Sequence, residues 1–407
     1  MFAIGVGDLD PTFNSGGTQF LPLNHGDNND DQANAVAIQS DGKILLAGSS
    51  QIAAGDFDFA VTRLNADGTL DTTFGTGGTA LVPFNLGPAG SRDDRAKGVA
   101  ILPDGSIVVG GYAQVDAAGN YDFALARLTP AGILDTTFGT ANSGKVTTAF
   151  DIGNDKRDEA NAIVVDTANQ RILLAGFADV AAGDADFAVA GYTFDGVLDT
   201  SFGSGGGTAT FAFDLGAFGF DIDDAQAIAL DPTNGNIVLA GMAQLSATNY
   251  DMAIARLLPD GSTVDTTFDG DGRQTVAFDV GGTDADAANA VVVLPDGRIA
   301  VAGTAAQLDI VDSDYAFAEL TAAGALDPTF DVDGKTTVAF NQGVGGERLD
   351  SAVGLVVQAD GKLVATGSAQ FGAANYEIGT VRLLADGTLD TSFGPAATGK
   401  VITMFHR

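Results

Sequence analysis

The sequence contains no cysteine and no tryptophan, and it has only two histidines in 407 residues. Without cysteine there can be no disulfide, thiol nucleophile or zinc–thiolate site. His25 and His406 lie in the two terminal segments, which are poor places for the central base of a Ser–His–Asp arrangement. A phosphate loop of the G-x-x-x-x-G-K-[ST] type is also missing. We therefore expect that the protein is not an enzyme.

Positive charge is scarce, because 19 Lys and Arg residues face 53 Asp and Glu residues, for a net charge of −34. Such a surface repels nucleic acids and anionic membranes, so we expect no nucleic-acid partner. No apolar run approaches the ~20 residues that cross a bilayer, so no membrane span is expected. The start, MFAIGVGDLD, does not resemble a signal peptide; for a secreted protein the signal is not present in this chain.

A phrase of the form LDTTFG recurs seven times, with its aspartates 61 to 66 residues apart. These aspartates are Asp10, Asp71, Asp135, Asp199, Asp265, Asp327 and Asp390. We expect each of these aspartates to cap a turn by accepting hydrogen bonds from backbone N–H groups. A fixed repeat of this length indicates a repeat architecture rather than two or three unrelated domains.

One repeat unit reads as four short strands. Alternating ANAVAIQ (33–39) predicts the first, and the apolar run KILLAG (43–48) predicts a second strand that is buried on both faces. DFAVTRL (58–64) and TALVPF (79–84) predict the third and fourth strands. Tight turns at Asp41-Gly42 and Asp67-Gly68 join them as hairpins. Four antiparallel strands per unit, without helical periodicity, are typical of a propeller blade.

The phrases LDTTFG (70–75), QSDGKILLAG (39–48) and DFAVTRLNADGTLD (58–71) resemble the delta-60 repeat family. The resemblance runs from about residue 9 to residue 405. It implies a β-propeller from a bacterial protein, often exported. This family has no established biochemical role, so the resemblance implies fold and location more than function.

We therefore expect an all-β protein: one β-propeller domain over residues 1–407 with six four-stranded blades and an extra N-terminal strand element. The expected units are 1–23 (partial), 24–84, 85–150, 151–213, 214–278, 279–340 and 341–407. The first three strands of the unit each occur six times, but the fourth strand occurs seven times. The N-terminal copy of the fourth strand is therefore expected to close the ring. A seven-bladed ring completed by another chain is the alternative. We expect a monomer.

Two further acidic positions recur in every unit. One opens the third strand, as at Asp58, and an Arg follows five residues later in four units, as at Arg63. We expect a structural ion pair between or within blades at this position, and a ligand contact is the alternative. The other precedes the first strand. Since Ca²⁺ prefers several carboxylate oxygens, calcium in these loops is one hypothesis, and a cap on the inner strand is the other. These aspartates are Asp31, Asp94, Asp158, Asp223, Asp286 and Asp350.

A functional residue should depart from the repeat, because residues common to every unit serve folding. Phe218 and Phe220 are inserted among acids in loop 214–225, where aromatic rings could stack on sugars. Tyr112, Gln114 and Gln244 lie near the second-to-third connections and are further candidates for ligand contact, although the repeated Gln also suits a structural hydrogen bond.

The main functional hypothesis is a non-catalytic extracellular or cell-surface module for binding or adhesion, which presents an acidic loop face to a glycan or protein. Stabilisation of this module by calcium is part of the hypothesis. The first alternative is an extracellular polysaccharide hydrolase or lyase with carboxylates at its channel mouth. The second is an architectural segment of a larger surface protein.

Overall fold

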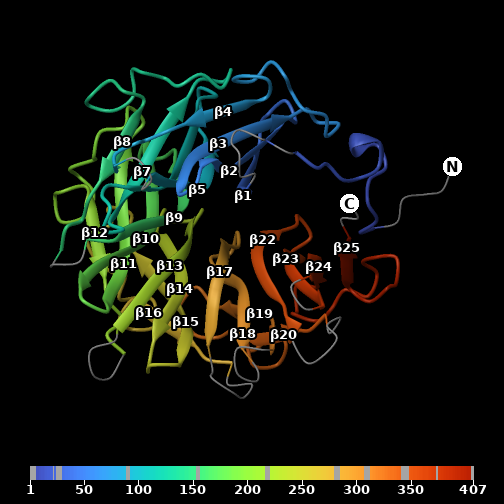
Figure 1. The fold of residues 1–407 in the computed structure, drawn as a ribbon. Helices are drawn as coiled ribbons and strands as arrows, with labels where there is room; N and C mark the ends of the chain where they lie inside the picture. Colours follow the sequence, from blue (N-terminus) through green and yellow to red (C-terminus); the bar gives the residue numbers. More distant parts are fainter. Residues whose placement is uncertain are drawn as a thin grey trace. The chain divides into compact units, whose positions relative to one another are not determined.

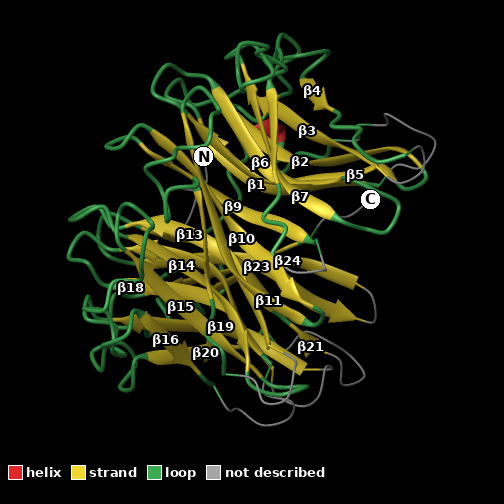
Figure 2. Ribbon diagram, turned by 90° about the vertical axis from the view of Figure 1, so that its left-hand side faces the viewer, coloured by secondary structure: helices red, strands yellow, loops and turns green. Residues whose placement is uncertain are grey.

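The computed structural model describes residues 6–21, 23, 30–88, 92–152, 156–215, 221–278, 285–306, 312–340, 348–372 and 375–404. The chain forms two compact units. The N-terminal unit is Leu9–Phe211, and the C-terminal unit is Ala212–Arg407 together with Met1–Asp8. Nearly all regular structure is β, and one 3₁₀ turn, η1 (Phe13–Ser15), is the helix drawn in Figure 2. No helix in the described ranges is long and apolar enough to cross a membrane.

The N-terminal unit contains three four-stranded antiparallel sheets, each built from consecutive strands (Figure 1). The first is β1 (Asp31–Ile38), β2 (Ile44–Ala53), β3 (Asp56–Leu64) and β4 (Thr79–Val82). The second is β5 (Arg92–Ile101), β6 (Ile107–Gln114), β7 (Tyr121–Leu128) and β8 (Lys145–Thr148). The third is β9 (Asp158–Asp166), β10 (Arg171–Ala181), β11 (Asp184–Thr193) and β12 (Thr208–Phe211).

The C-terminal unit repeats this pattern. Its sheets are β13 (Asp221–Leu230), β14 (Ile237–Gln244), β15 (Tyr250–Leu257) and β16 (Arg273–Val276); β17 (Asp286–Val293), β18 (Ile299–Ala306), β19 (Asp312–Leu320) and β20 (Lys335–Val338); and β22 (Ser351–Val357), β23 (Leu363–Gly372), β24 (Asn375–Leu383) and β25 (Lys400–Thr403). The short β21 (Arg348–Leu349) runs parallel to β19. Each expected repeat unit after residue 23 thus contains one four-stranded sheet. Whether the two units form one domain stays a prediction.

The Asp-Gly turns form as the sequence predicts. Gly42 has a φ of +83°, and its N–H donates to Gln39 O, while Gln39 N–H donates to Lys43 O. Asp41 Oδ1 accepts the N–H of Lys43 at 3.1 Å. Glycine is needed because a side chain is strained at positive φ, and aspartate caps the turn.

A β-bulge in each first strand explains the glycine that ends the apolar second-strand motif. The register between β1 and β2 slips between Ala33 and Ala35. A Cβ on the facing Gly48 would lie 1.8 Å from Gln32 O, so only glycine permits this close approach. Equivalent contacts of 1.9–2.0 Å occur at Gly111, Gly176, Gly241, Gly303 and Gly367.

The core lies between successive sheets. In the N-terminal unit, Leu45, Phe59 and Val61 of the first sheet pack with Ile107 and Val109 of the second. Every residue of β6 is buried, which confirms the prediction that the second strand is covered on both faces. The buried apolar area is therefore shared between neighbouring sheets, and no sheet can bury its faces alone.

The expected N-terminal strand element is the exception. Residues 18–21 form no strand, although the same sequence pattern is a strand in the other units, and residues 1–5 lie outside the described ranges. A fourth strand needs a third strand to receive its backbone hydrogen bonds, as β4 has in β3. Instead, Gln19 and Phe20 line a pocket of about 210 Å³ beside β1, β2 and β3. The expectation of a strand at this place is therefore wrong for the described residues.

Candidate functional site

The aspartate of the LD-x-TF phrase caps a turn, as predicted, and also binds an arginine. Asp71 Oδ1 accepts the N–H of Thr73 at 3.1 Å, and Asp71 Oδ2 lies 2.8 Å from Arg63 Nε. Both side chains are at least nine-tenths buried. Arg63 also donates to Pro130 O at 2.6 Å and stacks over Phe74, so this turn lock joins the first sheet to the turn of the second.

Arg63 thus forms a structural ion pair, as expected, but its acid is Asp71 and not Asp58. Successive residues of a strand point to opposite faces, so residues five apart cannot meet. Two units lack the Arg of the third strand and have Gly191 or Glu319 there. In those units the cation comes from the first residue of β10 or from the residue just before β18: Arg171 Nε lies 3.8 Å from Asp199, and Arg298 lies 3.7 Å from Asp327.

The six aspartates that we considered as calcium ligands cap backbone N–H groups at the end of the preceding repeat unit. Asp94 Oδ2 accepts the N–H of Phe84 at 2.8 Å, and Asp350 Oδ2 accepts the N–H of Phe340 at 2.8 Å. The same bond is formed by Asp31, Asp158, Asp223 and Asp286. Within the described ranges, no group of three or more His, Cys, Asp or Glu side chains is placed to hold a metal ion. Calcium binding stays a prediction.

The predicted ligand residues are placed as follows. Gln114 is buried, where its Oε1 accepts the N–H of Asp93 at 3.1 Å and its Nε2 donates to Asp116 O. Gln244 is likewise buried and accepts the N–H of Ile222 at 3.1 Å. These bonds are structural. Phe218 and Phe220 lie outside the described residues.

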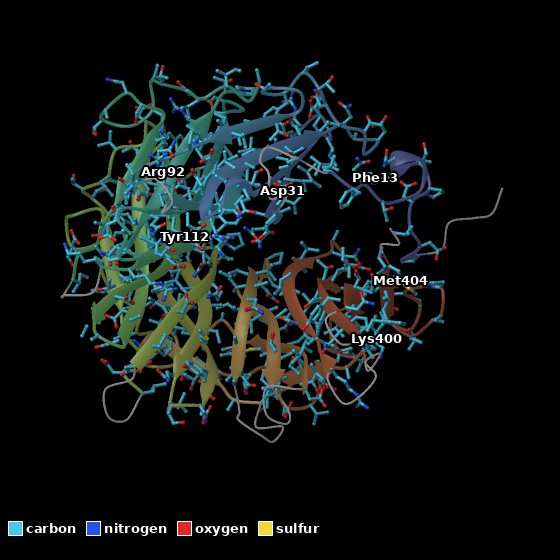
Figure 3. All side chains as sticks on the ribbon, in the orientation of Figure 1. Phe13, Asp31, Arg92, Tyr112, Lys400 and Met404 are labelled. Carbon is cyan, nitrogen blue, oxygen red and sulfur yellow. The ribbon has the colours of Figure 1, made fainter. Side chains whose placement is uncertain are left out.

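Tyr112 lies on β6 in the N-terminal unit (Figure 3). It belongs to a polar and aromatic group that we call the junction cluster. Arg95 of β5 is the register partner of Tyr112 on β6, so both side chains leave the same face of the second sheet. β5 and β6 both contact β9, the first strand of the third sheet. The members of the junction cluster are Asp93, Arg95, Lys97, Tyr112, Tyr121, Arg157 and Glu159.

Each carboxylate of the junction cluster is held by its own arginine. Arg95 Nε lies 2.6 Å from Asp93 Oδ1, and Arg157 Nε lies 2.6 Å from Glu159 Oε1. The guanidinium groups stack on phenylalanine rings, since Arg95 lies 4.0 Å above the ring of Phe57. Charge-assisted bonds of this length fix the orientation of both carboxylates.

The two tyrosines lie within the field of both carboxylates. Their rings meet edge to face, with centroids 5.1 Å apart. Burial raises the pKa of the Tyr112 hydroxyl, and the charges of Glu159 and Asp93 raise it further. Burial and the same two carboxylates also raise the pKa of Tyr121. Both hydroxyls are therefore neutral hydrogen-bond donors at physiological pH.

The sequence pointed to Tyr112 but not to the cluster around it. A usable signal existed, because the position of Arg95 is held in the other units by Gln32, Glu159, Asp224, Ala287 and Ser351. The bulge position is Lys97 here and Asn in three other units. These departures from the repeat lie inside strands.

Comparison with protein families gives repeated matches to one family, described as a domain of unknown function (DUF5122) beta-propeller. The matches cover residues 39–74, 102–138, 233–268, 294–330 and 358–393. This confirms the resemblance to a repeat β-propeller family of unclear function. Curated protein sequences give no match.

Similar solved structures share little sequence with the chain. A protein of unknown function from Dyadobacter fermentans is 13% identical (TM-score 0.47; 88% of this chain and 96% of that chain covered). An α-L-arabinanase from Penicillium chrysogenum is 9% identical (TM-score 0.46; 88% and 94%). An α-L-arabinofuranosidase from Fusarium graminearum is 9% identical (TM-score 0.45; 87% and 93%). The expectation that the chain is not an enzyme is contradicted by these hydrolase matches and is withdrawn. At this level of similarity they assign no reaction.

Proposed function

Because the chain carries repeats of the DUF5122 β-propeller family, we propose that it is an extracellular carbohydrate-active propeller that hydrolyses a polysaccharide at the junction cluster. The observation that carries the proposal is the pair of oriented carboxylates, Asp93 and Glu159, beside the two neutral tyrosines Tyr112 and Tyr121.

Glycoside hydrolysis requires two carboxyl groups, one that protonates the leaving oxygen and one that acts as a nucleophile or activates water. Asp93 and Glu159 come from different sheets, so a sugar ring placed between them would meet one group on each side. The proton of a tyrosine hydroxyl can hydrogen-bond a sugar oxygen, and an aromatic face can pack against the apolar face of the ring.

Access favours one side of the cluster. Asp93 and Glu159 are 24% and 11% exposed at the side chain, whereas Arg157 is 51% exposed. The ligand would therefore approach over Arg157 and reach the carboxylates last. An uncharged glycan fits this approach, because the arginines are already neutralised by their own carboxylates.

We propose further that the six sheets are the six blades of one propeller, with residues 6–17 as the closing element. Gly394 N–H donates to Val6 O at 2.8 Å in the C-terminal unit, and Asn14 N–H donates to Asp67 O at 2.6 Å in the N-terminal unit. The same type of bond joins successive turns inside each unit, as between Gly75 and Ala131. A seven-bladed ring stays the alternative.

The test is release of reducing sugar from a panel of neutral and acidic plant and bacterial polysaccharides. We compare the protein with its Asp93→Asn and Glu159→Gln variants and with Asp30→Asn, an exposed acid that directly precedes β1. Loss of a general acid or base lowers the rate by about 10²–10⁴-fold. We expect that loss for both site variants, with unchanged glycan binding on an affinity gel, and full activity for Asp30→Asn. Absence of turnover with every polysaccharide, or turnover that both site variants retain, would refute the proposal.

A further inference from the structure

The LD-x-TF turn has a further copy at residues 10–13, in front of the first sheet, and its backbone is built like that of the others. Asp10 Oδ1 accepts the N–H of Thr12 at 2.8 Å and its hydroxyl at 2.6 Å. Asn14 N–H donates to Asp67 O at 2.6 Å, so the turn is bound to the first sheet of the N-terminal unit. The same bond joins the turn of the first sheet to the second sheet. Residues 10–13 therefore occupy the place that the turn of a preceding sheet would take.

This N-terminal turn lacks the cation that the other six turns have. In each four-stranded sheet a guanidinium group lies 2.8 to 3.8 Å from the turn aspartate, as Arg63 lies beside Asp71. Within the described residues, no lysine or arginine forms an ion pair with Asp10, which is exposed. The residue eight positions before Asp10, where Asp71 has Arg63, is Phe2. The chain itself thus supplies no arginine at this position.

Residues 18–21 lie where the fourth strand of a preceding sheet would lie. Leu23 N–H donates to Asp31 Oδ2 at 3.2 Å, which is the same type of cap that follows β4, β8, β12, β16 and β20. Within the described residues, however, Gln19 and Leu21 form no backbone–backbone hydrogen bond. Their N–H and C=O groups are therefore open to an added strand.

A cavity of about 210 Å³ lies beside this segment, on the face of the first sheet that points away from the second sheet. Leu46, Ala60 and Thr62 line the cavity from β2 and β3, and Gln19 lines it from the segment. Gln19 Oε1 is buried and accepts no hydrogen bond from the described residues. Because protein interiors hold few voids larger than a water molecule, the cavity has room for side chains that this part of the chain does not supply.

The same face is covered in the second sheet. Val36 on β1 is 62% exposed, whereas Val99 at the same position of β5 is 8% exposed. Val99 lies in the apolar cluster between the first two sheets, to which β3 contributes Phe59 and Val61. Within the described part of the N-terminal unit, no strand brings such side chains to the first sheet. A third strand with an aromatic and a branched residue is therefore what the cavity lacks.

We propose that residues 10–21 and the first sheet bind an extended peptide segment of a partner protein, and that this segment has the third-strand pattern of the repeat, F-A-V-x-R. The segment adds as a strand to residues 18–21, and its aromatic and branched side chains enter the cavity. Its arginine reaches Asp10 and stacks on Phe13, as the third-strand arginine does with the aspartate and phenylalanine of the first sheet. The site is separate from the junction cluster.

Charge and geometry select this partner. With 53 acidic and 19 basic residues, the chain attracts a segment that carries positive charge. Arginine suits the position better than lysine, because its planar group can both bind a carboxylate and stack on an aromatic ring. A second folded copy of the chain is a poor donor, since all six of its third strands already pair on both sides within their own sheets. The partner is therefore a different chain with an unpaired segment of this pattern.

The test uses a fluorescein-labelled peptide with the sequence of residues 57–65, FDFAVTRLN, and measures its binding by fluorescence anisotropy. We expect saturable binding, and we expect Asp10→Asn to weaken it about three- to tenfold because the ion pair is lost. Asp195→Asn, which changes an acid of the same unit that is 86% exposed at its side chain, should leave binding unchanged. The peptide with Arg63→Gln should bind the Asp10→Asn variant and the unaltered protein equally, since the two changes remove the same contact.

Hydrogen exchange on the unaltered protein locates the peptide without the use of any variant. We expect slower exchange at residues 18–21 when the peptide saturates the protein. Absence of saturable binding at millimolar peptide would overturn the proposal, and so would binding that Asp10→Asn and the Arg63→Gln peptide both leave unchanged. Protection only in other strands would also overturn it, because the peptide would then pair with a different sheet edge. None of these results depends on whether the protein hydrolyses a polysaccharide.

Discussion

Replacing Arg127 by methionine should cost the protein more stability than replacing Arg63 by methionine. Both arginines occupy the same place in their sheets and lie in the same unit, and both hold the aspartate of an LD-x-TF turn, at 2.8 Å for Arg63 and 2.9 Å for Arg127. Asp71 has a second cation, because Lys43 Nζ lies 2.9 Å from its Oδ2.

The expected losses of unfolding free energy depend on the hydrogen-bond and ion-pair partners that each carboxylate retains in the variant. Removing one partner of a buried ion pair costs about 3–5 kcal/mol, since the remaining charge stays buried. Asp135 is 20% exposed, so we expect about 3 kcal/mol for Arg127→Met. Each variant also loses one bond to a backbone carbonyl, that of Arg127 to Phe194 O or that of Arg63 to Pro130 O, so this loss does not distinguish the two. For Arg63→Met we expect about 1–2 kcal/mol, since a charged hydrogen bond from Lys43 still satisfies Asp71.

The assay is urea-induced unfolding followed by circular dichroism, because the protein has no tryptophan. The double variant Lys43→Met/Arg63→Met provides the control, and its loss should exceed the sum of the two single losses. Equal losses for Arg63→Met and Arg127→Met, or an additive double variant, would show that the turn aspartates do not depend on a cation, and the account of the turn lock would fail.

Three further predictions follow from packing and charge. Gly241→Ala should cost about 3 kcal/mol or more, because its Cβ would lie 1.9 Å from Asp224 O, whereas Gly206→Ala should be neutral; urea unfolding measures both. Asn289→Ala should cost about 1 kcal/mol, since its Nδ2 donates at 2.8 Å to a carbonyl of the next sheet, and the same assay checks it. The turn aspartates have lowered pKa values, chiefly from hydrogen bonds and arginine charges that outweigh burial, so their stability is present above about pH 4 and should be lost as the pH falls below it. Unfolding at pH 7 and pH 3 measures this loss.

Local signals in the sequence predicted the sheets well. Asp-Gly pairs, short apolar runs and alternating segments each specify a turn or a strand without help from distant residues, as at Asp41-Gly42 and in β6. The error at residues 18–21 has the opposite origin. Strand structure there depends on a partner strand, and the same letters that form β4 beside β3 remain irregular without one.

The contacts of the repeated charges could not be read from spacing alone. The five-residue separation of Asp58 and Arg63 suggested a pair, but the strand directs them to opposite faces, and Arg63 meets Asp71 instead. The start of the third strand meets β5 instead, where Phe57 is the register partner of Asp93, 36 positions further along the chain. Long-range register of this kind is a property of the folded units.

The contrast between the turn lock and the junction cluster bears on where function lies. Where the third strand lacks its arginine, Arg171 or Arg298 approaches the same turn aspartate instead, so this aspartate has a cation nearby in each of the six four-stranded sheets. Compensation of this kind marks a contact that folding requires. The positions of Arg95 and Tyr112 change freely in charge and size between units, and no other residue restores them. Because the sheets form equally well with Ala287 as with Arg95 at the same place, folding does not require this group. The ion pairs and the paired tyrosines of the junction cluster are therefore available for contact with a molecule outside the fold.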